Sequence, residues 1–223
     1  MSMFNGRRSR AAGAILIFGL STGPMPLWGQ ARAQGTYNAT VKISGTEKGG
    51  DTRRVTYQAE IKMKIPVPGG NRSSAVIDIS DASAPSATVT VTQWNLEERN
   101  ATPDSDGKIT SWKCELAGPS TVPMMASGML NLNYSKQNYS MYVSLVAIEE
   151  TKLKCVNSRT GPYTRNETMG FFFGTTEPDS IPHDELPYKD AAQIAAKFRL
   201  VPKGAMKEKY LPQDQEWELT LVK

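Results

Sequence analysis

WKCELAGPSTVPMMASGMLNLNYSKQNYSMYVSLVAIEETKLKC, residues 112–155, is the stretch that decides the fold. It contains the only two cysteines of the chain, Cys114 and Cys155. Each lies in a segment that reads as a strand, and two alternating apolar–polar segments, Met129–Tyr134 and Tyr139–Ile148, lie between them. Such alternation is typical of strands with one buried face. We therefore expect a small β-meander tied end to end by one disulfide bond.

The same alternation recurs before this stretch. In Val55–Ile65 the odd positions are apolar or aromatic and the even positions are polar, and Tyr37–Ile43 repeats the pattern before a Gly49-Gly50-Asp51 turn. Ala75–Ile79 is a shorter example, and Ala87–Trp94 alternates valine with threonine, which favours strand over helix. The sequence therefore predicts an all-β, antiparallel fold, a β-sandwich or a barrel-like meander, in one domain.

The C-terminal part gives weaker signals. Met169–Phe173 is too apolar to be a loop, and Thr175–Lys189 has three prolines among acidic residues, which predicts a long irregular excursion. After it we expect a strand from Gln193 that forms a hairpin with Trp217–Val222. The alternative is a helical turn, so the expected fold has at most a short helix near residues 189–196.

The N-terminal segment has the three parts of a secretory signal peptide. Three arginines within the first ten residues precede the apolar segment Ala11–Leu20, and Ala31-Arg32-Ala33 places small residues at a cleavage site. The apolar segment is shorter than the roughly 20 residues that cross a bilayer. We therefore expect cleavage after Ala33, a single all-β domain over residues 34–223, and a periplasmic or secreted bacterial protein without a transmembrane span.

Removing residues 1–33 changes the charge balance. The chain has 26 basic and 22 acidic residues, and the first 33 residues contain four arginines and no acid. The remaining 190 residues therefore have 22 basic and 22 acidic residues, a formal net charge of zero. A nucleic-acid-binding protein needs a basic surface to displace counterions from phosphates. We therefore expect no nucleic-acid partner.

His183 is the only histidine, and its neighbours Asp184 and Glu185 could orient an imidazole as a catalytic base. No Gly-x-Ser-x-Gly motif accompanies it, and both cysteines are expected to be structural. A lone histidine in an acidic loop with several prolines is more often an exposed surface residue. These three residues are therefore a possible loop site, and no catalytic residue is predicted.

No metal site or cofactor is indicated. Asp104–Gly107 resembles part of an EF-hand calcium loop, but the register that fits its glycine places Lys113 where a bidentate glutamate is required. Three methionines in residues 124–129 match no copper-binding spacing, have no histidine nearby and are more simply core residues.

Trp94 is the best single candidate for a ligand contact. It continues the threonine side of Ala87–Trp94, so its indole is exposed if that side faces solvent, and buried if that side packs on a second sheet. The predicted export and the lack of a recognisable set of catalytic residues favour a non-catalytic binding or interaction module of the envelope or extracellular space. Its partner would be a protein, a glycan or a lipid. The alternatives are a hydrolase using carboxylates from separate strands and a purely structural envelope component.

Overall fold

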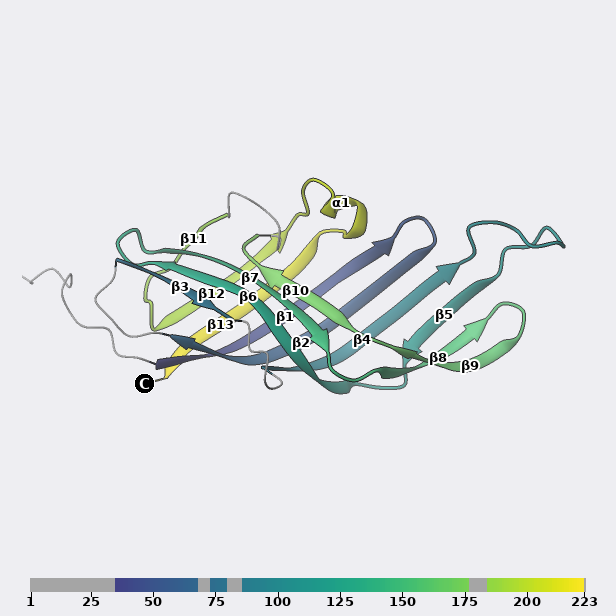
Figure 1. The fold of residues 1–223 in the computed structure, drawn as a ribbon, viewed down its shortest axis with the longest axis horizontal. Coiled ribbons are helices and arrows are strands. Elements are labelled where there is room, and N and C mark those ends of the chain that lie inside the picture. The colour runs from purple at the N-terminus through teal and green to yellow at the C-terminus, as the bar shows by residue number, and fades with distance from the viewer. Residues whose placement is uncertain (1–34, 68–72, 80–85, 177–183, 223) are drawn as a thin grey trace, which may run out of the picture. The chain divides into compact units, whose positions relative to one another are not determined.

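The fold is given by a computed structural model that describes residues 35–67, 73–79, 86–176 and 184–222. All of these belong to one compact unit, Ala31–Lys223. They form a 13-stranded antiparallel sheet (Figure 1). The all-β antiparallel fold expected from the sequence is thus confirmed. The expected signal peptide, residues 1–33, lies outside the described residues.

The N-terminal hairpin is the longest pairing in the sheet. β1 (Gly35–Gly49) and β2 (Arg53–Val67) each have 15 residues, and Gly50 in the turn between them has a positive φ of 60°. A tight hairpin turn requires this left-handed backbone, which glycine adopts without a steric cost. The odd-numbered side chains of the alternating segments in both strands are buried, as predicted.

One layer of the fold extends this hairpin on both sides. Its strand order is β4 (Ala87–Arg99), β2, β1, β13 (Gln213–Val222) and β12 (Gln193–Leu200). β12 and β13 pair as the sequence predicted. The only helix among the described residues, α1 (Met206–Lys209), lies in their connection instead of near residues 189–196. Residues 193–200 are a strand because each has a cross-strand partner on β13.

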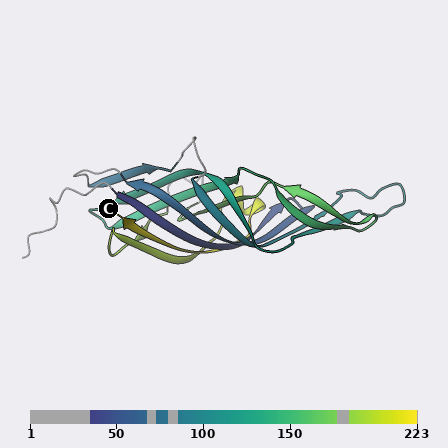
Figure 2. The same cartoon turned by 90° about the horizontal axis from the view of Figure 1, so that it is seen from below.

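The other layer consists of β6 (Ser120–Asn133), β7 (Asn138–Ala147) and β10 (Gly170–Gly174), with the short strands β3 (Ser74–Asp78) and β11 (Leu186–Pro187) beside them. The two layers face each other (Figures 1 and 2). Tyr139 of β7 meets Trp217 of β13 with ring centroids 6.5 Å apart, and Tyr57 of β2 meets Phe171 of β10 at 5.4 Å. One sheet therefore bends into a sandwich around its core.

β4 is where the sheet branches. Its first part, Ala87–Val91, pairs with β6, and its last part, Asn95–Arg99, pairs with β5 (Ser111–Leu116). β5 continues the sheet through β8 (Thr151–Asn157) to β9 (Gly161–Glu167), at the right of Figure 1. The described residues contain no helix long and apolar enough to cross a membrane.

The expected disulfide is present, but the strands of residues 112–155 do not pair in the expected consecutive order. Cys114 of β5 lies directly opposite Cys155 of β8, with their Cα atoms 4.0 Å apart. β5 pairs with β4 and β8, whereas β6 and β7 pair with each other in the second layer. The two cysteine strands are therefore direct neighbours. Long-range pairing with β4 separates β5 from β6, and alternation within a strand carries no information about such pairing.

Two buried glutamines of β13 close the sandwich along the free edge of β10. Gln213 Nε2 donates hydrogen bonds to Phe172 O at 2.9 Å and to Tyr57 Oη at 3.1 Å. Gln215 Oε1 accepts one from Gly174 N at 2.9 Å, and Gln215 Nε2 donates to Gln213 Oε1 at 2.8 Å. We refer to Gln213 and Gln215 as the glutamine clasp. It satisfies backbone groups that a buried edge strand would otherwise leave unpaired.

Candidate functional site

The possible loop site is only partly described. His183 lies outside the described residues, so its role stays a prediction. Asp184 Oδ2 forms an ion pair with Lys203 Nζ at 2.8 Å, and Glu185 accepts a hydrogen bond from Asn138 Nδ2. Both acids are exposed. Their oxygens bind surface side chains, which is ordinary for a solvent-facing loop.

Trp94 does not lie on the exposed threonine side of β4. Its side chain is 2% exposed. Two consecutive residues of β2 pair with Gln93 and Val91 of β4, so Thr92 is an extra residue that forms a β-bulge. Such a bulge reverses the alternation of the strand, and Trp94 and Leu96 therefore face the core together with Val91. Of the two alternatives from the sequence, the exposed indole is therefore wrong, and the indole is buried because of the bulge and not because the threonine side packs on a second sheet.

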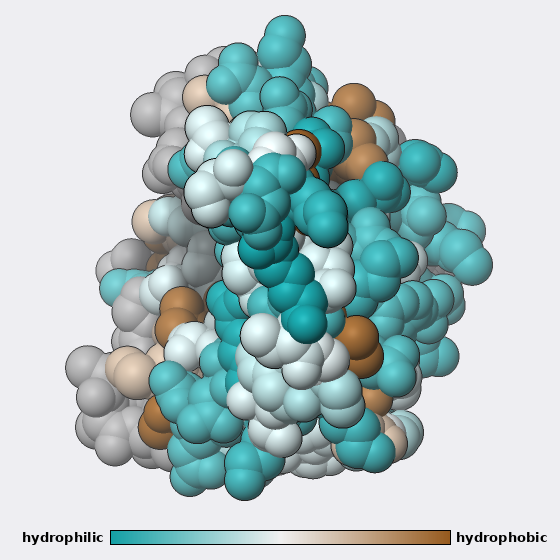
Figure 3. All heavy atoms as spheres, turned by 90° about the vertical axis from the view of Figure 1, so that its right-hand side faces the viewer, coloured by the Kyte–Doolittle hydropathy of each residue, from teal (hydrophilic) through white to brown (hydrophobic). Residues whose placement is uncertain are grey.

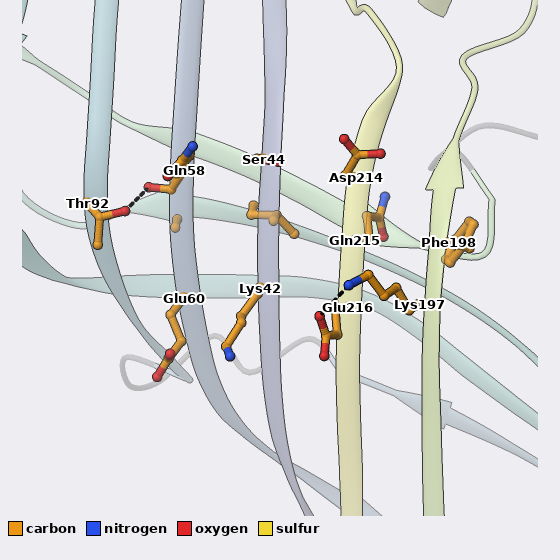
Figure 4. Close-up of a pocket in the computed structure, with 12 residues that line it drawn as sticks. Lys42, Ser44, Gln58, Glu60, Thr92, Lys197, Phe198, Asp214, Gln215 and Glu216 are labelled. Atoms are coloured by element: carbon orange, nitrogen blue, oxygen red, sulfur yellow. Dashed lines mark hydrogen bonds and ion pairs between the residues drawn. The ribbon is translucent and has the colours of Figure 1, made fainter.

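A shallow hollow of about 640 Å³ lies on the outer face of the first layer (Figure 4). Its polar side chains come from β4, β2, β1, β13 and β12. Lys42 lies opposite Glu60 on one side and Glu216 on the other, and Lys197 Nζ is 3.4 Å from Glu216 Oε2. These alternating charges are solvent-exposed and balance one another. Exposed pairs of this kind contribute little free energy, and the hollow has the character of a solvated sheet face.

A second, more enclosed pocket of about 360 Å³ lies beside β10, where it meets the hairpin end of β1 and β2. We refer to it as the indole pocket. Six residues from five parts of the chain define it: Glu47, Arg53, Tyr57, Trp94, Phe171 and Tyr210. Apart from β1 and β2, these parts are far from one another in the sequence. The pocket therefore exists only in the folded chain.

The floor of the indole pocket is an aromatic cluster. Phe171 packs edge-on against Trp94 and Tyr57, with ring centroids 5.6 Å and 5.4 Å away. Tyr57 and Trp94 are themselves 6.1 Å apart. Edge-to-face contacts of this kind stabilise a fixed ring arrangement. The three rings are thus held in place from three different strands.

The residues after α1 form one wall. Tyr210 forms an isolated backbone bridge with Glu47, and Leu211 N donates to Thr46 O at 2.9 Å. The Tyr210 ring packs edge-on against Phe172 with centroids 4.7 Å apart. Short backbone pairing and one aromatic contact therefore place Tyr210 over the end of β10.

Two polar groups of the aromatic floor are buried donors. Trp94 Nε1 is buried and has no hydrogen-bond partner among the described residues. Tyr57 Oη accepts a hydrogen bond from Gln213 Nε2 at 3.1 Å. Burial raises the pKa of Tyr57 above its ordinary value, and Tyr210 and Glu47 raise it further. Tyr57 is therefore a neutral hydroxyl that can donate at any ordinary pH.

A chain of ion pairs runs along one side of the pocket and includes its lining residues Glu47 and Arg53. Arg53 contacts Glu47 at 3.3 Å and Glu167 at 2.7 Å, and Arg165 contacts Glu167 at 3.3 Å and Glu98 at 2.6 Å. Both oxygens of Glu167 are thus bound by guanidinium groups. The hydrogen bond to Glu98 is the main cause that raises the pKa of Arg165. The chain links β1, β2, β9 and β4 beside the pocket.

Carboxylates from three separate strands, Glu47, Glu98 and Glu167, lie along this chain of ion pairs. Each is paired with an arginine, and both oxygens of Glu167 are in ion pairs. Paired catalytic acids need to face the scissile bond from two sides. The described residues also contain no group of three His, Cys, Asp or Glu side chains that could hold a metal ion.

A hollow of about 800 Å³ lies at the end of the sheet that carries β5, β8 and β9, and residues of these strands and of β4 line it. Figure 3 shows this side as largely hydrophilic, with hydrophobic areas separated from one another. Val156 and Tyr163 are exposed apolar residues of this region, at 56% and 37%. Both residues line this hollow.

Of the pocket residues, only Trp94 was a candidate from the sequence. Tyr57 was placed in the core by alternation, and Glu47, Arg53 and Tyr210 carried no signal. Comparison with models of known protein families, with curated proteins and with solved structures finds no match.

Proposed function

We propose that this protein is an exported, non-catalytic binding module that holds a small organic ligand in the indole pocket. The observation that carries the proposal is the indole pocket itself, a concave site of about 360 Å³ whose aromatic floor is held from three strands. Aromatic rings in a concave site give an organic ligand apolar surface to pack against. Glu47 and Arg53 add charged groups to the lining.

Three further observations support the proposal. The N-terminal sequence has the composition of an export signal, and a bonded cysteine pair is typical of oxidising compartments. The pocket is concave and combines aromatic rings with polar groups that could fix the orientation of a ligand. Its carboxylates are bound by arginines, which supports binding over catalysis.

The test is a screen of a chemically diverse fragment library by NMR on uniformly ¹⁵N-labelled protein. The indole N–H signal of Trp94 is assigned by its loss in Trp94→Phe. A pocket ligand should shift this signal and leave that of Trp217 in place, because Trp94 lines the pocket and Trp217 does not.

Two glycine variants provide a blocked pocket and a matched control. Gly170 lines the pocket, and a Cβ atom there would meet only Leu145 O at 3.5 Å, an ordinary contact. Gly170→Leu should therefore fill the pocket and abolish ligand binding. Gly118→Leu, which meets nothing within 4 Å and lies elsewhere, should not. Binding that survives Gly170→Leu, or a library without any pocket ligand, would refute the proposal.

A further inference from the structure

β12 ends the first layer with a regular open edge. Each of its eight residues has a cross-strand partner on β13, without a bulge, and no other described strand pairs with it. Leu221 N donates to Ala192 O at 2.8 Å, one position before the strand begins. Because hydrogen bonding alternates along an antiparallel strand, the backbone N–H and C=O groups of Ala195, Lys197 and Arg199 point away from β13.

This edge is open to solvent. Ala195 is exposed, and the side chains of Lys197 and Arg199 are 81% and 62% exposed. A row of unpaired backbone groups on an exposed strand is a template on which another strand can pair.

The other open edges of the described sheet are protected. β9 contains Pro162 and the ion-paired side chains of Arg165 and Glu167. β10 has the glutamine clasp along its edge, and β3 and β11 have only five and two residues. Prolines, charges and short strands are the usual means by which an edge avoids pairing. β12 is longer than β9 and has no proline.

The two basic residues of β12 are themselves of the protecting kind, but β13 balances both. Lys197 Nζ lies 3.4 Å from Glu216 Oε2, as Figure 4 shows, and an Arg199 guanidinium nitrogen lies 3.6 Å from Asp214 Oδ1. The edge therefore does not repel a neighbouring strand by a net positive charge.

A second copy of β12 fits this edge. In antiparallel pairing about a two-fold axis at Ala196, Ala196 stands opposite itself, and Ala195 and Lys197 stand opposite each other. These last two are residues whose backbone groups point to the edge, so they can exchange hydrogen bonds between the copies. A shift that placed Lys197 opposite itself would bring like charges together, which is destabilising. The register at Ala196 avoids this.

Charge complementarity supports the same register. Glu218 of β13 is the cross-strand neighbour of Ala195, and its Oε1 accepts a hydrogen bond from Gln193 Nε2 at 3.0 Å. It forms no ion pair with a basic side chain among the described residues. Lys197 of a second copy, placed opposite the small Ala195, would extend across it toward Glu218. Opposite charges on neighbouring strands stabilise a sheet.

The inner side of β12 is apolar and also matches itself. Ile194 is buried, whereas Ala196 and Phe198 are half-buried. The Phe198 ring packs edge-on against Trp217 with centroids 4.9 Å apart. In the register at Ala196, Phe198 stands opposite Ile194 of the second copy. Pairing would therefore extend the core of each copy across the contact.

We infer that two copies of this protein associate through β12 and join their first layers into one continuous antiparallel sheet. The surface is separate from the indole pocket, so the inference goes beyond the proposed binding function and does not depend on it. The contact has one strand from each copy. It therefore forms a small interface, and we expect a reversible dimer whose fraction grows with protein concentration.

A cysteine cross-link tests the register. Residues opposite each other without backbone hydrogen bonds have Cα atoms about 4.5 Å apart, which suits a disulfide. Ala196→Cys, oxidised by air with copper phenanthroline, should therefore give a covalent dimer on a non-reducing gel. Ala195→Cys is the control. Its side chain is more exposed, but the two copies of residue 195 would be roughly 8 Å apart, too far for a disulfide.

Sedimentation velocity at protein concentrations up to about 1 mM tests the association itself. Ala195→Pro removes an N–H that points to the edge, so the pairing with β13 keeps its hydrogen bonds and the melting temperature should change little. The dimer loses two hydrogen bonds, one from each copy, and should weaken tenfold or more. Ala195→Val adds similar bulk, keeps the N–H and should dimerise like the unaltered protein.

A protein that stays monomeric at the highest concentration would overturn the inference and leave the edge to a strand of another protein. A dimer that forms equally well with Ala195→Pro, or that cross-links as readily through Ala195→Cys, would overturn it in favour of another surface. If Ala195→Pro lowers the melting temperature, the two cysteine variants still decide, because neither removes a backbone N–H.

Discussion

Trp94 and Trp217 are the same residue type at the same exposure, 2%, but their indole nitrogens are in different situations. Trp217 Nε1 donates to Tyr139 Oη at 3.0 Å, whereas Trp94 Nε1 has no partner among the described residues. Equal burial of the two side chains therefore hides a difference in hydrogen bonding. Only the inventory of hydrogen-bond partners reveals it.

The pair gives a direct prediction about stability. Trp217→Phe breaks a buried hydrogen bond and leaves Tyr139 Oη without its donor, whereas Trp94→Phe breaks none. We expect Trp217→Phe to lower the free energy of unfolding by about 1 kcal/mol more than Trp94→Phe, with both losing packing. Urea unfolding of the two variants measures the difference. Equal losses would contradict the assignment of Trp94 Nε1 as unpaired.

At the scale of elements, the free edge of β10 is the point where the sandwich is closed. β10 pairs with β7 on one side only, and the glutamine clasp of β13 binds its other edge. Side chains thus replace a neighbouring strand at this place. The clasp also fixes Tyr57 at the pocket floor through Gln213, so the closure of the fold and the geometry of the pocket depend on the same residues.

Gln215→Leu tests this closure. It leaves the Gly174 amide and Gln213 Oε1 without partners in the core, so we expect a loss of about 1–3 kcal/mol in unfolding free energy. Hydrogen exchange at the Gly174 amide should also become faster. The control is Gln193→Leu, because Gln193 is exposed and binds Glu218 on the surface. Unchanged protection at Gly174 would show that the clasp does not hold the edge.

The disulfide joins β5 and β8, the neighbouring strands through which the sheet extends beyond the two core layers. Cys114 and Cys155 are 41 residues apart, so their bond restricts a long loop of the unfolded chain. We expect Cys114→Ser with Cys155→Ser to lower the unfolding free energy by about 2–4 kcal/mol, from lost loop restriction and buried hydroxyls.

Chemical denaturation of this double variant measures the loss of unfolding free energy. Mass spectrometry of a non-reduced digest of the unaltered protein tests whether the Cys114–Cys155 bond is present. Two thiols that can be alkylated in the native protein would contradict it. Because β6 and β7 lie in the other layer, the sandwich itself should persist in the variant, with its loss of protection concentrated in β5, β8 and β9.

The whole molecule buries tyrosines between its layers, and this sets its behaviour at high pH. Burial raises the pKa of Tyr139 from 10.0 to about 12, and the hydrogen bond from Trp217 opposes this only in part. Below pH 10 the hydroxyl is neutral in both the folded and unfolded chains. Above it the unfolded chain ionises first, so stability falls as pH rises, by roughly 2 kcal/mol at pH 12 from this group alone.

Urea unfolding at a series of pH values from neutral to about 12 measures this slope. Tyr139→Phe should have a lower stability at neutral pH, because Trp217 loses its acceptor, but a flatter decline above pH 10. The quantity to compare between the two proteins is the slope of unfolding free energy against pH, not the free energy at any one pH. An identical slope in the variant would show that Tyr139 ionises equally in both states.

The sequence by itself determined the strands and which side of most of them is buried. Alternation in Val55–Ile65 and Tyr139–Ile148 is a local property, since neighbouring side chains of a strand point to opposite faces. It also identified the cysteine pair and the strand from Gln193. These features follow from residues close together in the chain, so no knowledge of the partner strands was needed.

Only the tertiary structure decided which strands are neighbours and where a pocket forms. A bulge opposite β2 turned Trp94 into the core, and pairing with β4 moved β6 and β7 away from the two cysteine strands. The indole pocket joins Glu47, Trp94 and Phe171, which are distant in sequence. Their proximity depends on register and on the bend of the whole sheet, and no local pattern encodes either one.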